Sequence, residues 1–154
     1  MEINTKAPDF KLFNTDKKEI TLSDNEGKHV LLLFFPLAFT STCTAELCSI
    51  KDNYSIYNNL NTIVYGISVD SLFTLAKFKS DQNLNFELLS DFNKTASKDY
   101  NCLYNEFVFG MKGVSKRAAF VIDKDGKIQY SEILENAGEL PDFNAINNCL
   151  NKLN

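Results

Sequence analysis

The stretch HVLLLFFPLAFTSTCTAELC, residues 29–48, contains the pattern that decides the fold. Its first seven residues are too apolar to face water on either side, which predicts a central parallel strand over 29–35. Pro36 ends that strand because proline cannot donate a hydrogen bond to the sheet. Apolar residues then recur at helical spacing, which predicts a helix over about 44–58. A buried strand followed directly by a helix indicates an α/β protein.

The rest of the chain continues this alternation and predicts a thioredoxin-like α/β fold. Parallel strands joined by crossover helices, with an antiparallel pair at one side, give a central mixed sheet flanked by helices. We expect one domain over 1–154, with an N-terminal β-hairpin. The further expected elements are a hairpin over 9–22, a strand over 62–69, a helix capped by Asp70 or Ser71, a strand over 86–89, a short helix over about 93–100, a hairpin over 118–134 with Gly126 in its turn, and a closing helix with Phe143, Ile146, Cys149, Leu150 and Leu153 on one face.

Composition excludes several classes of protein. The chain has 154 residues, of which 44% are hydrophobic, and this fits a single domain with a well-filled core. The formal net charge is −4 and the 16 basic residues are scattered, so the basic stripe of a nucleic-acid-binding protein is missing. The N-terminus lacks the features of a targeting signal, and no apolar run approaches the length of a membrane span. We therefore expect a soluble cytoplasmic protein that binds neither nucleic acid nor membranes.

The four cysteines point to thiol chemistry or to burial. In a reducing compartment they should be mostly thiols, which argues against a disulfide framework. The sequence has no CxxC motif, and His29 is its only histidine, so no spacing typical of a zinc site is present. We expect neither a metal nor a cofactor.

Cys43 lies where a strand gives way to a helix, the place where reactive groups collect in open α/β sheets. Unpaired N–H groups and the helix dipole favour an anion there, so we expect a thiolate, although many cysteines are small core residues. Ser41 or Thr42 is expected to cap the helix. Thr40 precedes the thiol by three residues, so its hydroxyl can turn into the same pocket and donate to an oxyanion or accept a proton.

Arg117 is the second candidate site residue. It is the only arginine among 16 basic residues and stands at the start of the strand AAFVID. A guanidinium stays charged when partly buried and offers a planar fork of donors, which a lysine cannot. A lone arginine in a lysine-rich chain therefore indicates a geometric need. The alternative is that Arg117 merely ends a strand in solvent.

These residues together resemble the peroxiredoxin family. The run PLAFTSTC over 36–43 has the P-x-x-x-T-x-x-C spacing of the peroxiredoxin signature. The segments APDFKLFNTDKKEITLSD, GISVDS and SKRAAFVIDKDGKI are also similar to their counterparts in that family, so the resemblance covers nearly the whole chain. A second cysteine five residues after the first is most similar to the AhpE-like and Q-type, or bacterioferritin-comigratory, branches.

The resemblance implies a thiol-dependent peroxidase that reduces hydrogen peroxide, alkyl hydroperoxides or both. It implies that Cys43 is the peroxidatic cysteine, that Thr40 hydrogen-bonds the peroxide, and that Pro36 shields the thiolate. It further implies that Arg117 completes the site and that Glu46 orients the guanidinium. Glu46 could equally be a first-turn acidic residue that complements the helix dipole.

Cys48 is expected to resolve the sulfenic acid that forms at Cys43. On an intact helix the two Cα atoms are roughly 8–9 Å apart, beyond the ~7 Å limit for a disulfide, so the first turn must unwind. We expect an intramolecular disulfide that a thioredoxin-like or glutaredoxin-like donor reduces. Alternatively Cys48 packs in the core and an external thiol acts; Cys102 could be either, and Cys149 is expected in the core.

Two other functions use the same residue or the same fold. A redox sensor or chaperone-like protein would also use Cys43, whereas a thioredoxin-like disulfide exchanger is disfavoured by the missing CxxC. Peroxiredoxins of similar sequence often pair near the active-site loop. We therefore expect a homodimer that uses Phe39 and the segment 107–114, although that segment could also be core.

Overall fold

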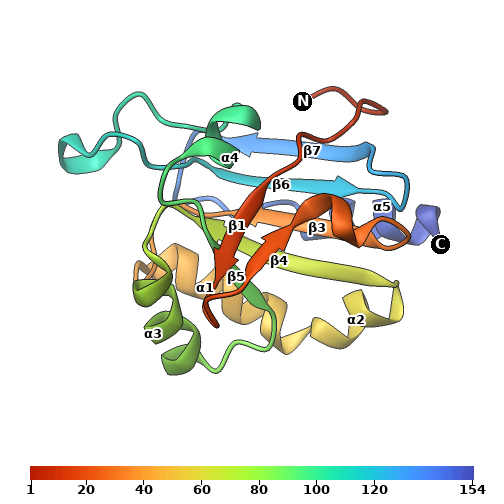
Figure 1. Cartoon of the computed structure of the whole chain (residues 1–154), viewed down its shortest axis with the longest axis horizontal. Helices are drawn as coiled ribbons and strands as arrows, with labels where there is room; N and C mark the ends of the chain where they lie inside the picture. Colours follow the sequence, from red (N-terminus) through yellow and green to blue (C-terminus); the bar gives the residue numbers. More distant parts are fainter.

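The computed structural model describes residues 1–154 and contains one twisted seven-stranded sheet with the order β2-β1-β5-β4-β3-β6-β7 (Figure 1). The three strands β3, β4 and β5 run parallel, whereas β6 and β7 are antiparallel additions on one side. The predicted mixed sheet of a thioredoxin-like fold is therefore confirmed. The strands are β1 (Lys11–Asn14), β2 (Glu19–Thr21), β3 (His29–Phe34), β4 (Thr62–Ser68), β5 (Glu87–Ser90), β6 (Arg117–Ile122) and β7 (Ile128–Leu134).

The N-terminal hairpin forms as predicted and joins the same sheet. Strand β1 pairs antiparallel with β2 and also with β5, where Phe13 lies opposite Ser90. The sequence pattern did not show this second pairing, because it depends on residues far apart in the chain.

Helices form where predicted, with one correction. The structure has α1 (Ser41–Asp52), α2 (Tyr54–Asn59), α3 (Leu72–Gln82), α4 (Thr95–Asp99) and α5 (Phe143–Leu153), with short 3-10 turns η1 (Leu22–Asn25) and η2 (Val108–Gly110). The single helix expected over 44–58 is wrong, because the chain breaks at Asn53. Asn53 has φ −112° and ψ 18°, outside the helical values, and its side chain and its backbone N–H both donate to the carbonyl of Ser49, at 2.9 and 3.2 Å.

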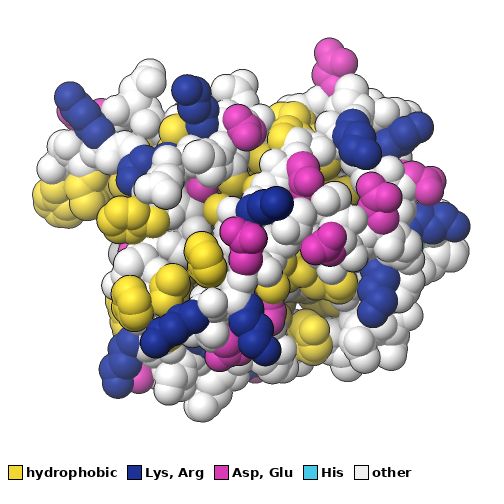
Figure 2. All heavy atoms as spheres, viewed as in Figure 1, with side chains coloured by type: hydrophobic (Ala, Val, Ile, Leu, Met, Phe, Trp, Pro, Cys, Tyr) yellow, Lys and Arg dark blue, Asp and Glu magenta, His cyan; other side chains and the backbone are white.

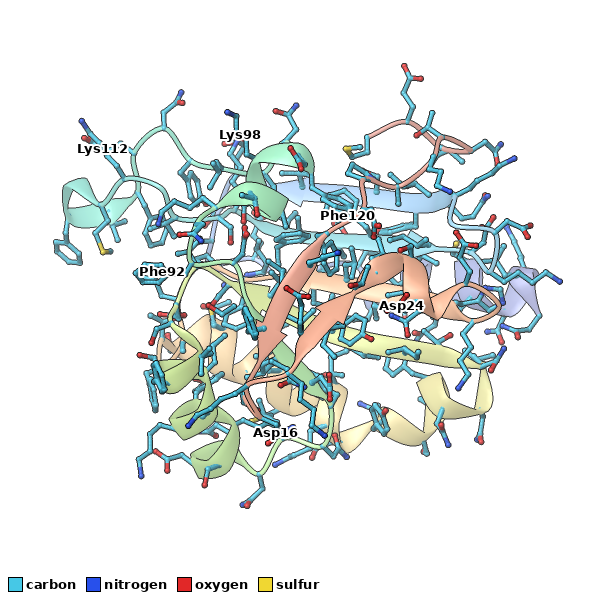
Figure 3. The ribbon with its side chains drawn as sticks, in the orientation of Figure 1. Asp16, Asp24, Phe92, Lys98, Lys112 and Phe120 are labelled. Carbon is cyan, nitrogen blue, oxygen red and sulfur yellow. The ribbon has the colours of Figure 1, made fainter.

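Two apolar clusters cover the two faces of the sheet, and β3 separates them. Leu31 and Leu33 pack on one face with residues of α1, α2, α3 and α5, whereas Leu32 and Phe34 pack on the other. Every residue of β3 is buried, as expected for a central strand. Figure 3 shows Phe120 of β6 among the packed side chains, whereas Lys98 and Lys112 extend outward.

The closing helix α5, the turn between β6 and β7, and the cap of α3 form as the sequence predicted. Ile146 and Leu150 of α5 are buried, and the three other apolar residues of its predicted face pack partly buried against the same cluster. Gly126 has φ +81° in the turn between β6 and β7, as predicted. Ser71 caps α3 by accepting a hydrogen bond from the N–H of Thr74 at 3.2 Å. None of the helices combines the length and the apolar composition needed to cross a bilayer.

Candidate active site

The loop from β3 into α1 brings Cys43 to the amino end of a helix. Thr40 is the N-cap residue, with φ −88° and ψ 153°, so the expected caps Ser41 and Thr42 are wrong. The Thr40 hydroxyl donates to the carbonyl of Leu37 at 2.7 Å and makes no capping bond. The first backbone bond of the helix runs from Thr44 to Thr40 at 2.9 Å. The N–H groups of residues 41–43 therefore have no acceptor, and they make this helix end attractive to an anion.

Cys43 lines a cavity of about 290 Å³ and is only 1% exposed. Both polar and apolar side chains line the cavity. Neither histidine nor carboxylate lines the cavity, so Cys43 is its only side chain of the kinds that commonly bind metals. The lining residues are Pro36, Leu37, Thr40, Ser41, Thr42, Cys43, Phe107, Val108, Phe109, Met111, Arg117, Ala137 and Gly138.

Arg117, the first residue of β6, reaches the sulfur from a distance of 74 positions in the sequence. Its Nη2 lies 3.3 Å from the Sγ of Cys43 and donates to the carbonyl of Ala137 at 2.9 Å. Its Nη1 donates to the Oε1 of Glu46 at 3.0 Å. The side chain is 1% exposed, which excludes an arginine that simply ends a strand in solvent. Three acceptors thus hold the guanidinium in one orientation.

Glu46 and Arg117 form a fully buried ion pair. Burial raises the pKa of Glu46 to about 7, and the charge of Arg117 counteracts only part of this effect. Burial also opposes the charge of Arg117, but the adjacent Glu46 and Cys43 outweigh it and raise its pKa. The guanidinium therefore stays charged beside the sulfur, and this cation favours the thiolate. The Oε2 of Glu46 is buried without a hydrogen-bond partner.

Pro36 and Thr40 line the same cavity as Cys43 and Arg117, so the structure brings four of the six predicted site residues together there. Glu46 does not line the cavity, but its Oε1 accepts the hydrogen bond from the Nη1 of Arg117. Cys48, the sixth, is partly buried further along α1, with its Sγ 3.5 Å from the Oε1 of Gln82.

The other two cysteines lie away from this cavity. Cys102 is 0% exposed and packs in the cluster on the opposite face of the sheet from Cys43. Burial raises its pKa to about 12, and the charge of Asp91 adds to the effect. Cys149 lies on α5 with its Sγ 3.6 Å from the carbonyl of Gln129, and burial raises its pKa as well. Both fit packing roles.

Three features of this site were not predicted. The carbonyl of Ala137 fixes the guanidinium, and a backbone acceptor leaves no signal in the sequence. Phe107 and Met111 line the cavity, whereas the apolar composition of their segment had suggested only a dimer contact or core packing. Asp70, expected as a possible helix cap, instead accepts a hydrogen bond from the N–H of Ala38 in the active-site loop at 2.8 Å. The neighbouring Ser71 caps the helix. A helix needs only one N-cap residue, so two candidate caps in a row could have indicated that one of them binds elsewhere.

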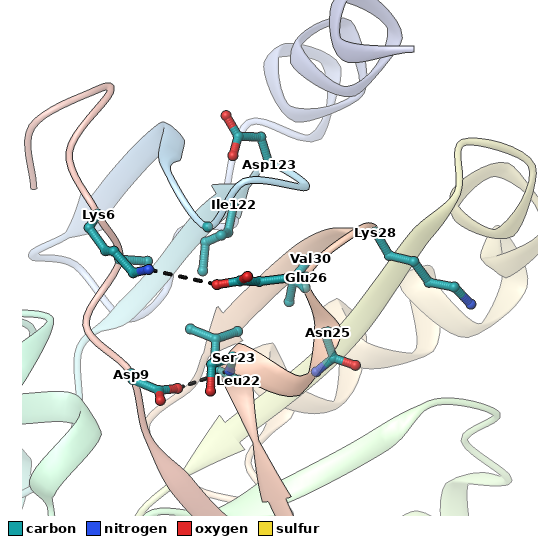
Figure 4. Close-up of a pocket in the computed structure, with 12 residues that line it drawn as sticks. Lys6, Asp9, Leu22, Ser23, Asn25, Glu26, Lys28, Val30, Ile122 and Asp123 are labelled. Carbon is teal, nitrogen blue, oxygen red and sulfur yellow. Dashed lines mark hydrogen bonds and ion pairs between the residues drawn. The ribbon is translucent and has the colours of Figure 1, made fainter.

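A second hollow lies at the opposite end of the sheet, next to Val30 and Ile122 (Figure 4). Lys6 and Glu26 form an ion pair across it at 3.7 Å. Its lining mixes lysines with carboxylates and holds neither cysteine nor arginine. The Cys43 cavity is therefore the stronger candidate for chemistry.

The family of the chain follows from its match to known proteins. Residues 3–131 match the family described as AhpC/TSA. The chain belongs to this peroxiredoxin family. The resemblance inferred from the signature PLAFTSTC is thus confirmed at the level of the family.

Individual peroxiredoxins match over different shares of their length. The 2-Cys peroxiredoxin BAS1 of Spinacia oleracea chloroplasts is 39% identical over 142 residues, which cover 85% of this chain and 52% of that protein. The putative peroxiredoxin bcp of Coxiella burnetii is 37% identical over 130 residues, covering 83% and 85%. The crystal structure of peroxidoxin BcpB from Mycobacterium tuberculosis superposes with a TM-score of 0.87 at 26% identity, covering 100% and 99%. The chain therefore spans about half the length of the chloroplast relative.

Proposed function

We propose that this chain is a single-domain thiol peroxidase that reduces hydroperoxides through a sulfenic acid on Cys43. One observation carries the proposal: the Sγ of Cys43 lies 3.3 Å from the Nη2 of Arg117, at a helix amino end and in the lining of a cavity. Membership of the AhpC/TSA family supports the same chemistry.

In the proposed reaction the thiolate attacks the terminal oxygen of the hydroperoxide in line with the O–O bond. The S–O bond forms as the O–O bond breaks, and the electron pair leaves with the distal oxygen as hydroxide or alkoxide, which takes a proton from water. Cys43 becomes a sulfenic acid, and the peroxide is reduced. Negative charge moves from sulfur to oxygen, so donors at the receiving position stabilise the transition state more than the ground state.

Three polar groups of the site can stabilise this charge or orient the peroxide. Arg117 supplies a fixed cation, and the unpaired N–H of Cys43 supplies a backbone donor. The Thr40 hydroxyl gives its proton to the carbonyl of Leu37 and therefore offers lone pairs to the cavity. It thus accepts a hydrogen bond from the O–H of the hydroperoxide, which points the terminal oxygen at the sulfur.

The lining of the cavity supports alkyl hydroperoxides as substrates beside hydrogen peroxide. Apolar side chains of Leu37 and of the segment 107–111 line the cavity together with its polar groups. The segment extends outward from the sheet in Figure 1, and its side chains offer apolar surface for an alkyl group. Burial of that group would add binding energy in proportion to its apolar area.

Cys48 is the proposed resolving residue, because it is the nearest other thiol in sequence and is partly exposed. The helix between the two cysteines must unwind, and its first turn is held by few backbone bonds. The sulfur of Cys48 then attacks the sulfenic sulfur: the S–S bond forms as the S–O bond breaks, and the leaving hydroxide takes the proton of the Cys48 thiol and departs as water. A dithiol donor of the thioredoxin-like or glutaredoxin-like kind restores both thiols by disulfide exchange.

Peroxide consumption by the reduced protein tests this function. The chain has no tryptophan, so consumption of hydrogen peroxide and of cumene hydroperoxide is followed directly, with thioredoxin, its reductase and NADPH as the recycling system. We expect repeated turnover and, with limiting peroxide, a Cys43–Cys48 disulfide in peptide maps. Oxidation no faster than that of free cysteine would contradict the peroxidase. A single oxidation without turnover would favour a sensor, and Cys43 sulfinic acid with Cys48 still free would contradict the two-cysteine version.

We also propose a cytoplasmic homodimer. Exposed apolar side chains gather on the side of the molecule where the segment 107–114 projects (Figure 2). Phe73 and Phe92 are exposed as well, at 68% and 59%. Phe39 is 50% exposed and Phe109 97% exposed, which leaves them available for a second copy. A reducing compartment would keep the thiols ready for the cycle. Light scattering of the wild type and of Phe109→Ser tests the dimer, which we expect the substitution to weaken.

A further inference from the structure

Asp70 lies two residues after the end of β4, beside the loop that leads to Cys43. Its Oδ2 accepts hydrogen bonds from the N–H of Ala38 at 2.8 Å and from the hydroxyl of Ser68 at 2.7 Å. Ser68 is fully buried at the end of β4, and the hydroxyl of Ser90 at the end of β5 donates to the carbonyl of Asp70 at 2.6 Å. Two neighbouring parallel strands therefore hold Asp70, and its carboxylate holds the loop.

The loop needs such a restraint. Phe39 adopts φ +67°, in the left-handed region that bulky side chains rarely occupy. Strained backbone of this kind persists only where the surroundings hold it, and it is common at active sites. Two contacts act here: the ring of Phe39 packs edge-on against Phe78 with centroids 5.1 Å apart, and Asp70 binds the adjacent Ala38. Thr40 follows at once and caps the helix of Cys43.

We propose that Asp70 is a positioning residue for the peroxidase reaction. By holding the N–H of Ala38, it fixes the loop conformation in which Thr40 lines the cavity above the sulfur. It is absent from the cavity lining and acts only through the loop. Capping of α3 does not need it, because Ser71 accepts the N–H of Thr74. The inference rests on the proposed peroxidase function.

The test compares two reactions of the same sulfur in Asp70→Ala and in the wild type. Alkylation by iodoacetamide depends on the thiolate and its access, whereas peroxide reduction also needs the positioned groups of the loop. We expect the rate constant with cumene hydroperoxide to fall about tenfold, while alkylation changes by less than about twofold. Asp70→Asn should keep most of the peroxide rate, because an amide oxygen can accept both hydrogen bonds.

Asp123→Ala is the matched control. The Oδ1 of Asp123 accepts two backbone N–H groups, each at 2.9 Å, in the turn at the other end of the sheet. We expect it to lose stability without changing either rate. Equal falls in both rates for Asp70→Ala, or no fall in either, would overturn the proposal.

A second variant keeps the proposal testable if Asp70→Ala does not fold. Ser68→Ala leaves the carboxylate with Ala38 as its only bound donor, so a fall of about threefold in the ratio of peroxide rate to alkylation rate is expected. An unchanged ratio would count against Asp70 as a positioning residue. Failure of the wild type to reduce peroxide faster than free cysteine would instead refute the peroxidase function itself.

Discussion

Cys43 and Cys102 are both buried, at 1% and 0% exposure, yet different groups surround them. The Sγ of Cys43 lies 3.3 Å from a guanidinium nitrogen, in the first turn of a helix whose first three N–H groups have no acceptor. Cys102 packs in a cluster rich in aromatic rings, and burial with the nearby charge of Asp91 raises its pKa to about 12. Burial alone therefore says little about thiol chemistry, because the groups that meet the charge decide whether a buried sulfur ionises.

The largest effect should come from exchanging each sulfur for oxygen. In Cys43→Ser we expect peroxide reduction to fall by at least about a thousandfold, because the nucleophile is lost. Cys102→Ser should keep the wild-type rate in the fraction that folds. Peroxide consumption by both variants checks this. A large loss in Cys102→Ser at full folding would break the comparison.

Removing the cation should make the surroundings of Cys43 resemble those of Cys102. In Arg117→Met we expect the peroxide rate to fall by roughly two to three orders of magnitude, since one preorganised donor is worth about that much. The neighbouring Lys116→Met, which leaves the donor in place, is the matched control and should retain the rate. A mild loss in Arg117→Met would mean that the helix end alone activates the sulfur.

Glu46 should make disulfide formation depend on pH. Its pKa is raised from 4.5 to about 7 in the folded helix, whereas unwinding exposes the carboxyl and restores its ordinary value. The folded helix binds the proton more tightly, so its advantage is fully present below about pH 4.5 and is lost as the pH rises through about 7. We therefore expect unwinding, and with it the yield of Cys43–Cys48 disulfide over sulfinic acid, to increase roughly sixtyfold between pH 5 and 7.5.

Glu46→Gln isolates this effect, because glutamine keeps an acceptor for Arg117 but does not titrate. Other pH-dependent steps contribute the same slope to both proteins, so only the difference in slope reports Glu46. Mass spectrometry after limited oxidation gives the ratio of the two products. Parallel profiles would show that Glu46 keeps its proton state when the helix unwinds.

The smallest effect should be on stability. Cys102→Ala removes a buried sulfur from a packed cluster and should lower the free energy of unfolding by about 1 kcal/mol. The midpoint of urea unfolding measures the change. Alkylation of wild-type Cys102 should appear only within that unfolding transition, whereas Cys43 should react in the native protein. Early alkylation of Cys102 would contradict the contrast between the two sulfurs.

Local pattern predicted much of the fold because its causes are local. Pro36 ends the strand through its missing N–H, and the helical spacing of α5 and the turn at Gly126 follow from their own residues. A single arginine in a lysine-rich chain indicated that Arg117 has a specific geometric role, and the resemblance to the signature around Cys43 indicated that its partner is this cysteine. In each case neighbouring residues or a rare residue type held the information.

The remaining features depend on the backbone conformation of single residues or on contacts between distant segments. Asn53 leaves the helical conformation although the apolar spacing continues unbroken through it, so the spacing predicted one helix where the structure has two. Thr40 rather than Ser41 or Thr42 became the N-cap, since the loop conformation decides where the helix begins. The bond between Asp70 and Ala38 joins residues 32 positions apart, and nothing in either local sequence announces it.

The break at Asn53 has a consequence for how the oxidised protein is recognised. Tyr57 of α2 is 2% exposed and belongs to the same apolar cluster as β4, so unwinding between Cys43 and Cys48 can end at the break without disturbing α2. Amide exchange in the disulfide form should then show a footprint with a sharp edge at residue 53. The rest of the surface would be unchanged. A reducing partner would therefore have to distinguish the oxidised protein from the reduced one by the unwound segment between Cys43 and Asn53.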